Sequence, residues 1–179
     1  MAHRIDSQHS CCFTGHRPHR LPWGYRERDP RCRALKAVLA ARIQHAYDEG
    51  ARHFLCGMAS GSDLYFCQAI LSLRRHHPDV TLEAVLPCQD QTKYWPRAQK
   101  ARWFRLLAQC DLVTVVQHGY GPLCMKRRNE YMVNRVTHLI ALYDGHPWGG
   151  TFDTILYALE RGILPDVIGI GTPESTINK

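Results

Sequence analysis

The chain has 179 residues, 45% of them hydrophobic and 22% charged, and its 23 Lys and Arg against 16 Asp and Glu give a net charge of +7. These proportions exclude disordered, collagen-like and repeat proteins, and no apolar run approaches the ~18–20 residues that a membrane span requires. The positive balance indicates an anionic partner without identifying it.

A chain of this length is expected to form a single domain over residues 1–179, with a core of about residues 10–170 and frayed ends. The polar stretch from Met1 to Ser10 lacks the apolar core of a signal peptide. The eight cysteines are irregularly spaced and form no CxxC pair. We therefore expect reduced cysteines and a cytoplasmic protein with no membrane partner.

Short apolar runs alternate with stretches of helical period, and this alternation predicts a parallel α/β sheet. In chain order the predicted strands are Ser10 to Thr14, His53 to Gly57, Leu82 to Leu86, Leu112 to Val116, His138 to Tyr143 and Val167 to Ile170. The predicted helices are Arg31 to Glu49, Ser62 to His76, Tyr94 to Cys110, Met125 to Val136 and Thr151 to Arg161. Because the strands are apolar along most of their length, helices are expected on both faces of the sheet.

The first candidate binding motif directly follows the first strand, and in parallel sheets ligands bind beyond the carboxyl ends of strands. It contains Thr14, Gly15, His16 and Arg17. The glycine allows close backbone approach, the threonine hydroxyl can bond a phosphate oxygen, and the guanidinium of Arg17 can bind one with two N–H groups. The alternative is a tight turn with a solvated arginine. The long aperiodic segment from Gly15 to Pro30 is expected to be functional or mobile.

The second motif is a glycine-rich turn after the second strand, with the sequence Gly57-Met58-Ala59-Ser60-Gly61-Ser62-Asp63. Such a turn, opening into a helix, presents free backbone N–H groups to an anion. Ser62 is predicted as the helix N-cap, and Asp63 either caps backbone amides or contacts a ribose hydroxyl. The spacing matches neither GxGxxG nor the P-loop.

Two further motifs open later helices. Lys126, Arg127, Arg128 and Asn129 begin a helix with three cations, which oppose the helix dipole unless an anion is bound there; the alternative is a solvated basic face. The turn after the fifth strand ends in Gly149, Gly150 and Thr151, with Thr151 placed to cap the last helix and to bond phosphate or ribose. The two glycine-rich turns are expected to face one another across a crevice.

Other patterns predict no chemistry of their own. The eleven histidines are scattered without paired metal-ligand spacing, so no metal is expected, and no GxSxG elbow is present. Cys12 and Cys56 fall in predicted strands and are expected in the core. The aromatic positions Trp95, Trp103 and Phe104 recur at near-helical spacing and are also predicted as core, whereas Tyr94 and Arg97 are expected to face the crevice.

These motifs, in this order, resemble the YpsA-type branch of the SLOG superfamily, which also contains DprA and the LOG phosphoribohydrolases. The resemblance spans about residues 10–170 and implies a Rossmann-like fold, a three-layer sandwich with a mostly parallel sheet flanked by helices on both faces. It also implies a pocket for a nucleotide or a nucleotide-derived ligand, similar to ADP-ribose or NAD, with no other cofactor. The site residues that it implies are Thr14, Gly15, His16, Arg17, Gly57, Met58, Ala59, Gly61, Ser62, Asp63, Arg128, Asn129, Gly149, Gly150 and Thr151.

One departure from the LOG pattern concerns catalysis. LOG enzymes carry a PGGxGTxxE segment whose glutamate serves cleavage of the N-glycosidic bond, and in this chain the third residue after Thr151 is Thr154. Asp153 and Glu160 do not fit the spacing. The resemblance therefore leaves open whether the chain is a sensor or a hydrolase of N-glycosidic or phosphate bonds, and no catalytic residue is assigned.

Two partners remain to be weighed from the sequence. The first is a small phosphorylated, nucleotide-like ligand, favoured because Arg17 and the run from Lys126 to Arg128 adjoin glycine-rich turns. The alternative is single-stranded nucleic acid, bound as by DprA through the net charge and exposed aromatic residues. A third alternative is an interaction scaffold whose pocket is vestigial and binds no ligand. The sequence also leaves open whether the chain forms a homo-oligomer.

Overall fold

The computed structural model describes residues 9–170, which form an all-parallel sheet of six strands in the order β4-β3-β2-β1-β5-β6. The strands are β1 (Ser10–Thr14), β2 (His53–Cys56), β3 (Thr81–Leu86), β4 (Leu112–Val115), β5 (His138–Tyr143) and β6 (Asp166–Gly169). β1 pairs with β2 on one side and with β5 on the other. The strand order therefore reverses beside β1, as in Rossmann-like folds.

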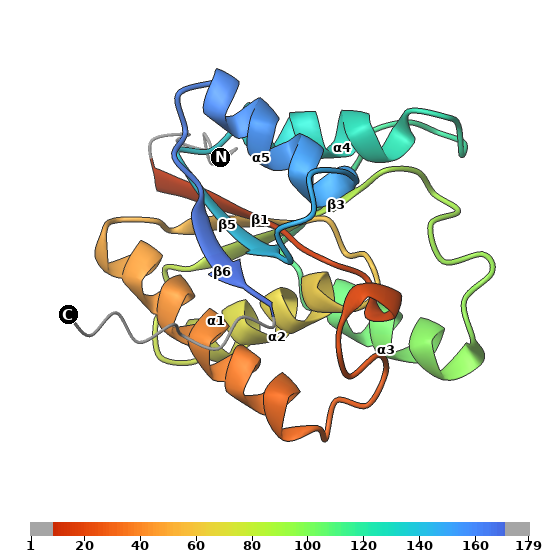
Figure 1. The fold of residues 1–179 in the computed structure, drawn as a ribbon, viewed down its shortest axis with the longest axis horizontal. Helices are drawn as coiled ribbons and strands as arrows, with labels where there is room; N and C mark the ends of the chain where they lie inside the picture. Colours follow the sequence, from red (N-terminus) through yellow and green to blue (C-terminus); the bar gives the residue numbers. More distant parts are fainter. Residues whose placement is uncertain (1–8, 171–179) are drawn as a thin grey trace.

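Helices cover both faces of the sheet, so the fold is the expected α/β sandwich (Figure 1). The helices are α1 (Pro30–Asp48), α2 (Ser62–Arg74), α3 (Arg97–Leu107), α4 (Cys124–Val133) and α5 (Gly150–Glu160). Figure 1 shows α1, α2 and α3 below the sheet and α4 and α5 above it. This division follows from the right-handed crossovers, because β1 to β4 progress in one direction along the sheet and β5 and β6 lie on the other side of β1.

The predicted strands and helices all form, but three helices end earlier than predicted: α2 at Arg74, α3 at Leu107 and α4 at Val133. α3 begins at Arg97 and not at Tyr94, because Pro96 is its N-cap and a proline disfavours helical backbone in the residue before it. The segment between β1 and α1 contains an unpredicted 3₁₀ turn, Pro18–Arg20. The predicted fray from Gly171 onward lies outside the described residues.

The core confirms most of the apolar pattern. Every residue of β1 and β2 is buried, including Cys12 and Cys56, as two covered faces require. Phe13 of β1 stacks on Phe66 of α2 with ring centroids 4.9 Å apart, which fixes α2 beneath the first strand. All eight cysteines are free thiols, as predicted from their spacing.

Two predictions about burial are wrong. The edge strand β4 leaves Leu112, Val113 and Val115 exposed at 44%, 49% and 40%, because β4 pairs only with β3 and no helix covers it fully. Phe104 is 57% exposed, while Trp103, on the inner face of the same helix, is 3% exposed. Local apolar periodicity thus fails where an element lies at the edge of the fold. No helix within residues 9–170 is long and apolar enough to cross a membrane.

Candidate functional site

A cavity of about 390 Å³ lies beyond the carboxyl ends of β1, β2 and β5. It forms there because the loop after β1 turns below the sheet while the turn after β5 leads above it, which opens a crevice at the reversal of strand order (Figure 1). Its lining residues are Phe13, Thr14, Gly15, His16, Arg17, His19, Arg20, Ala59, Asp63, Met125, Arg128, Asn129, Met132, Trp148, Gly150 and Thr151.

The cavity brings together residues from all four predicted motifs. These are Thr14, Gly15, His16, Arg17, Ala59, Asp63, Arg128, Asn129, Gly150 and Thr151. The other predicted residues do not line the cavity: Gly57, Met58, Gly61, Ser62 and Gly149. Contact of any of these residues with a ligand stays a prediction.

The centre of the site is a buried ion pair between α4 and α2. Arg128 Nη1 lies 3.5 Å from Asp63 Oδ2, and both side chains are 7% exposed. Burial raises the pKa of the Asp63 carboxyl, which the charge of Arg128 and the backbone N–H of Ala59 partly offset. Burial likewise lowers the pKa of Arg128. The helical run of three cations is therefore not a uniformly solvated face, because Arg128 points inward while Lys126 and Arg127 are exposed.

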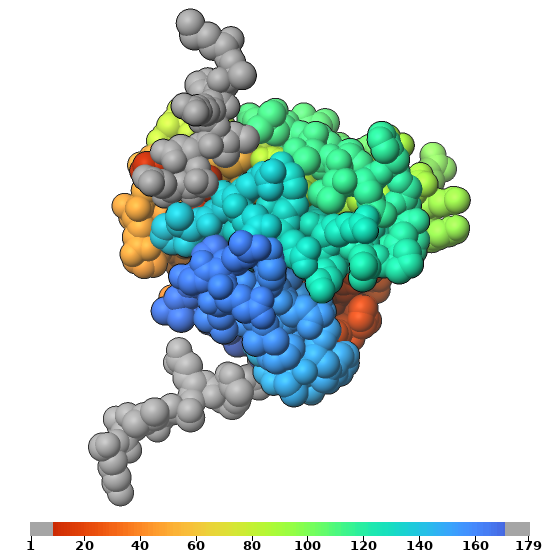
Figure 2. Space-filling view, turned by 90° about the horizontal axis from the view of Figure 1, so that it is seen from above, coloured from red at the N-terminus to blue at the C-terminus, as the bar shows by residue number. Residues whose placement is uncertain are grey.

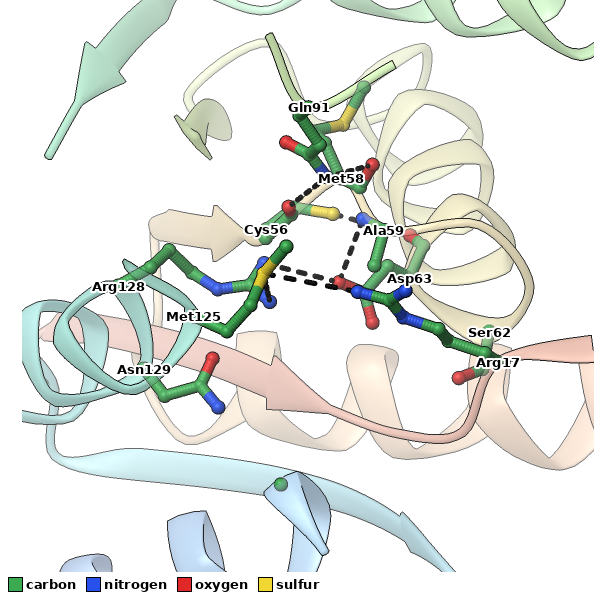
Figure 3. A network of polar contacts seen from close by, with 12 residues as sticks. Arg17, Cys56, Met58, Ala59, Ser62, Asp63, Gln91, Met125, Arg128 and Asn129 are labelled. Carbon is green, nitrogen blue, oxygen red and sulfur yellow. Dashed lines mark hydrogen bonds and ion pairs between the residues drawn. The ribbon is translucent and has the colours of Figure 1, made fainter. Parts of the chain in front are cut away.

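Arg128 is incompletely satisfied by the protein. Its Nε and Nη1 make no hydrogen bond among the described residues, although both atoms are buried. Figure 3 shows Arg128 and Arg17 reaching toward one another from opposite sides, with Asp63 and Met125 between them. Arg17 is exposed, and its Nη2 lies 3.9 Å from the sulfur of Met125, a weak acceptor. The guanidinium groups of Arg17 and Arg128 thus both lie near the single carboxylate of Asp63, which leaves an excess positive charge in the cavity.

Gly57 is required by this arrangement. A Cβ added there would lie 1.5 Å from Arg128 Nη1 and 2.9 Å from Asp63 Oδ2. We expect Gly57→Ala to displace the buried guanidinium and to lower the free energy of unfolding by about 1–3 kcal/mol, the usual range for overpacking. Chemical denaturation of Gly57→Ala beside Gly150→Ala measures this, because a Cβ at Gly150 meets nothing within 4 Å. Equal stability of the two variants would show that Arg128 moves aside without cost.

The glycine-rich turn after β2 differs from its prediction. Ser62 is the first residue of α2 and not its N-cap, which is Gly61 with a φ of +91°. The Ser62 hydroxyl instead donates to the carbonyl oxygen of His16 at 2.8 Å, and the Ser62 N–H donates to the same oxygen. These bonds join the turn to the loop after β1. Since the Ala59 N–H also donates to Asp63, at least two amides of this turn, those of Ala59 and Ser62, are used within the protein.

A histidine from the loop after β1 lies between a carboxylate and a hydroxyl from the segment that follows β5. His16, which is 4% exposed, has Nδ1 at 3.4 Å from Thr151 Oγ1 and Nε2 at 3.2 Å from Asp144 Oδ1. Burial lowers the pKa of His16, and the neighbouring carboxylate of Asp144 partly offsets this. Burial raises the pKa of Asp144, but the His146 N–H, His16 and Arg20 outweigh it and bring the pKa to about 2.

The start of α5 leaves the positive end of its dipole facing the cavity. The N-cap is Gly149, with a φ of +96° and no capping side chain, so the prediction that Thr151 caps this helix is wrong. Thr151, the second residue of α5, lines the cavity, is 5% exposed and lies against His16. The first-turn backbone N–H groups of a helix favour an anion. The α5 turn, rather than the α2 turn, is the better placed of the two to hold phosphate.

The sequence analysis missed the cavity residues Arg20 and Trp148, and also Asp144, which holds Arg20 but does not line the cavity. Arg20 donates to Asp144 Oδ2 at 2.7 Å and stacks its guanidinium on the Trp148 ring, 4.2 Å from the centroid. Asp144 directly follows β5, so its position was a usable signal. Arg20 gave no such signal, because the 3₁₀ turn that directs it was not predicted. Tyr94 and Arg97, expected in the crevice, do not line the cavity, and Tyr94 is 88% exposed.

A larger hollow of about 720 Å³ adjoins the cavity between α4 and α5. Figure 2 shows these two helices side by side on one face, in teal and blue. The two hollows share Met125, Asn129 and Gly150. The lining of the larger one includes the carboxylates Glu130, Asp153 and Glu160, an unsuitable set for phosphate. The arginine-lined cavity is therefore the stronger candidate for an anion site.

The chain is similar in sequence to several bacterial proteins. The chain is 26% identical over 133 residues to a UPF0398 protein of Bacillus pumilus, covering 73% of this chain and 71% of that protein. It is 26% identical over 134 residues to UPF0398 protein YpsA of Bacillus subtilis, covering 74% of each. It is 28% identical over 144 residues to the prophage-derived protein YoqJ of Bacillus subtilis, covering 73% of this chain and 84% of YoqJ.

Among solved structures, the chain is similar to DNA processing protein A of Helicobacter pylori, described as binding single-stranded DNA. The TM-score is 0.61 at 14% identity, covering 98% of this chain and 70% of that one, which supports a shared fold. The family model described as the YspA SLOG family matches residues 11–155, which contain the whole of the arginine-lined cavity. By this match the chain belongs to the YpsA family of SLOG proteins.

Proposed function

We propose that the arginine-lined cavity binds the phosphate of a nucleotide or a nucleotide-derived ligand. The observation that carries this proposal is Arg128, which is 6% exposed and has two guanidinium nitrogens, Nε and Nη1, without hydrogen bonds among residues 9–170. A buried cation with unused donors is costly unless a ligand pairs with it. A phosphate bound between Arg128 and Arg17, near the start of α5, would accept hydrogen bonds from these nitrogens.

The size of the cavity favours a small ligand. Its volume of about 390 Å³ lies in the range of small-molecule sites, and Arg17, Arg128 and Thr151 converge on it from three segments of the chain. Such convergence of a few polar groups fixes the orientation of a ligand. ADP-ribose, AMP and related molecules are therefore suitable probes for ligand binding.

Calorimetry with AMP and ADP-ribose tests the phosphate site. Arg17→Ala is expected to weaken binding about tenfold or more, because charge-assisted hydrogen bonds contribute about 1.5–3 kcal/mol. Gly150→Asp should weaken it at least as much by placing a negative charge at the start of α5, where an acidic residue does not harm the helix itself.

The matched control is Gly150→Ala, since a side chain there meets nothing within 4 Å. It should retain wild-type affinity. Unchanged binding in both Arg17→Ala and Gly150→Asp would refute the proposed phosphate site.

The geometry supports binding more directly than bond cleavage. Thr154, at the position of the LOG glutamate, donates to the Gly150 carbonyl at 2.6 Å and accepts from Asn129 Nδ2 at 2.8 Å. Asp63 is the only carboxylate among the described residues that line the cavity, and it is paired with Arg128. The role that we propose is therefore a nucleotide-binding protein, with no residue assigned to hydrolysis.

Single-stranded nucleic acid is the second candidate, favoured by the fold shared with DNA processing protein A of Helicobacter pylori. Basic side chains beside exposed aromatic rings, such as Lys93 near Tyr94 with 5.4 Å between Nζ and the ring centroid, suit stacking on bases. Oligonucleotide affinity that falls steeply with salt would support this candidate. Negligible affinity for a short homopolymer at moderate salt would exclude it.

A further inference from the structure

Trp148 is a large aromatic residue left open at the edge of the arginine-lined cavity. Its exposed fraction is 60%, whereas Trp23 and Trp103 are 4% and 3% exposed. Tryptophan rings are mostly buried in folded proteins, and an exposed ring beside a cavity is typical of a binding site. Trp148 lines the cavity together with Arg17 and Arg128, so it adjoins the proposed phosphate site.

The ring is held in place although it is not in the core. The guanidinium of Arg20 covers one face, with Cζ 4.2 Å from the ring centroid, and Arg20 is fixed in turn by Asp144 at 2.7 Å. The imidazole of His146 meets the ring edge-on, with centroids 6.0 Å apart. A cation on one face leaves the other face of the indole for a second flat group. The side chain is thus positioned before any ligand arrives.

Trp148 also lies next to the proposed phosphate site in the sequence. Trp148 is followed by Gly149, whose φ is +96°, and by the first residues of α5, Gly150 and Thr151. A Cβ at Gly149 would lie 2.9 Å from Arg20 Nη1, so the glycine allows Arg20 to pack against the turn. Figure 2 shows the loop after β1 (orange-red) reaching the surface beside this turn (light blue).

We propose that Trp148 is the stacking platform for the nucleobase of the ligand, and this inference rests on the proposed phosphate site. A nucleotide carries a flat aromatic base joined through ribose to its phosphate, and the cavity offers an aromatic face and a cationic pocket in one continuous lining. The base belongs either to a free nucleotide or to a single strand of nucleic acid, because both present the same ring. Stacking is tolerant of base identity, so Trp148 contributes affinity more than base selectivity.

Calorimetry with AMP and ribose 5-phosphate isolates the contribution of the base. Trp148→Ala is expected to weaken AMP binding about tenfold, the effect of losing one stacked base, and to leave ribose 5-phosphate within about twofold. Trp148→Phe should restore most of the AMP affinity, and AMP should quench tryptophan fluorescence in the wild type but not in Trp148→Phe. Tyr25→Ala is the matched control, because Tyr25 is 66% exposed but lies outside the cavity lining.

The outcomes distinguish failure of the stacking role of Trp148 from failure of the proposed phosphate site. Equal weakening of AMP and ribose 5-phosphate in Trp148→Ala, or no weakening of either, overturns the stacking role while the phosphate site stands. Failure of the wild type to bind AMP, ribose 5-phosphate and oligothymidylate overturns both. Thymidine 5′-phosphate and a short oligothymidylate distinguish the two sources of the base: a Trp148→Ala effect on both supports a mononucleotide site, and an effect on the oligonucleotide alone supports a single strand.

Discussion

Removing either member of the Arg128–Asp63 pair is expected to lower the free energy of unfolding by about 3–5 kcal/mol, the cost of leaving one buried charge without its partner. The two variants should differ. Asp63→Ala leaves a guanidinium that cannot lose its proton, whereas Arg128→Met leaves a carboxyl that can gain one. Asp63→Ala should therefore be the less stable at neutral pH, as measured by urea denaturation.

The pH dependence of the stability of Arg128→Met follows from the direction in which the pKa of Asp63 is shifted. Burial already raises the pKa of Asp63, and loss of the neighbouring cation raises it further. The folded state then binds more protons than the unfolded state, so the stability of Arg128→Met falls as pH rises through that raised pKa and recovers as pH falls. The wild type, in which the charge of Arg128 partly offsets that rise, should show the same trend more weakly.

Phosphate provides the discriminating measurement for Asp63→Ala. If Arg128 is an anion site, inorganic phosphate should raise the melting temperature of Asp63→Ala by more than that of the wild type, because it replaces the missing charge. Lys126→Ala is the matched control on α4, since Lys126 is 66% exposed in its side chain. A melting temperature of Asp63→Ala that phosphate leaves unchanged would count against a phosphate-binding Arg128.

The sequence predicted the sheet well because buried parallel strands have a strong local pattern. β1 and β5 begin and end at the predicted residues, and the other strands lie within one residue at each end. The exposure of β4 was not predictable in the same way. Its sequence, Leu112 to Val115, is as apolar as that of a central strand, and only the strand order shows that it lies at an edge.

The site was predicted as a set of motifs but not in its details. The four motifs meet at one cavity because the carboxyl ends of parallel strands lie at the same edge of the sheet. The burial of Arg128 had a usable signal: Cys124, Arg128 and Met132 recur at four-residue spacing, and all three face inward. Ser62 had no such signal, because the pattern Gly-Ser-Asp does not reveal that Gly61 takes a positive φ and becomes the N-cap.

A second buried charge, away from the cavity, should govern the response to acid. Glu83 of β3 is 2% exposed and bonds to His53 at 2.9 Å and to Thr114 at 2.6 Å, with Tyr131 at 3.4 Å. Burial alone raises the pKa of the Glu83 carboxyl, but these hydrogen bonds hold it below the ordinary value of 4.5. The network joins β2, β3, β4 and α4, so its loss affects the whole sheet.

Glu83→Ala is therefore expected to lower the free energy of unfolding by about 3–5 kcal/mol at neutral pH, as for other broken buried pairs. Because the folded-state pKa is lowered, the contribution of the charged carboxyl is complete above about pH 4.5 and is lost as pH falls through the lowered pKa. The stability difference between the wild type and Glu83→Gln should accordingly shrink on acidification. Glu49→Gln, at a half-exposed site, should change stability by less than about 1 kcal/mol at any pH. A wild-type advantage over Glu83→Gln that persists below pH 3 would mean that shape and packing, rather than the carboxylate charge, hold these strands together.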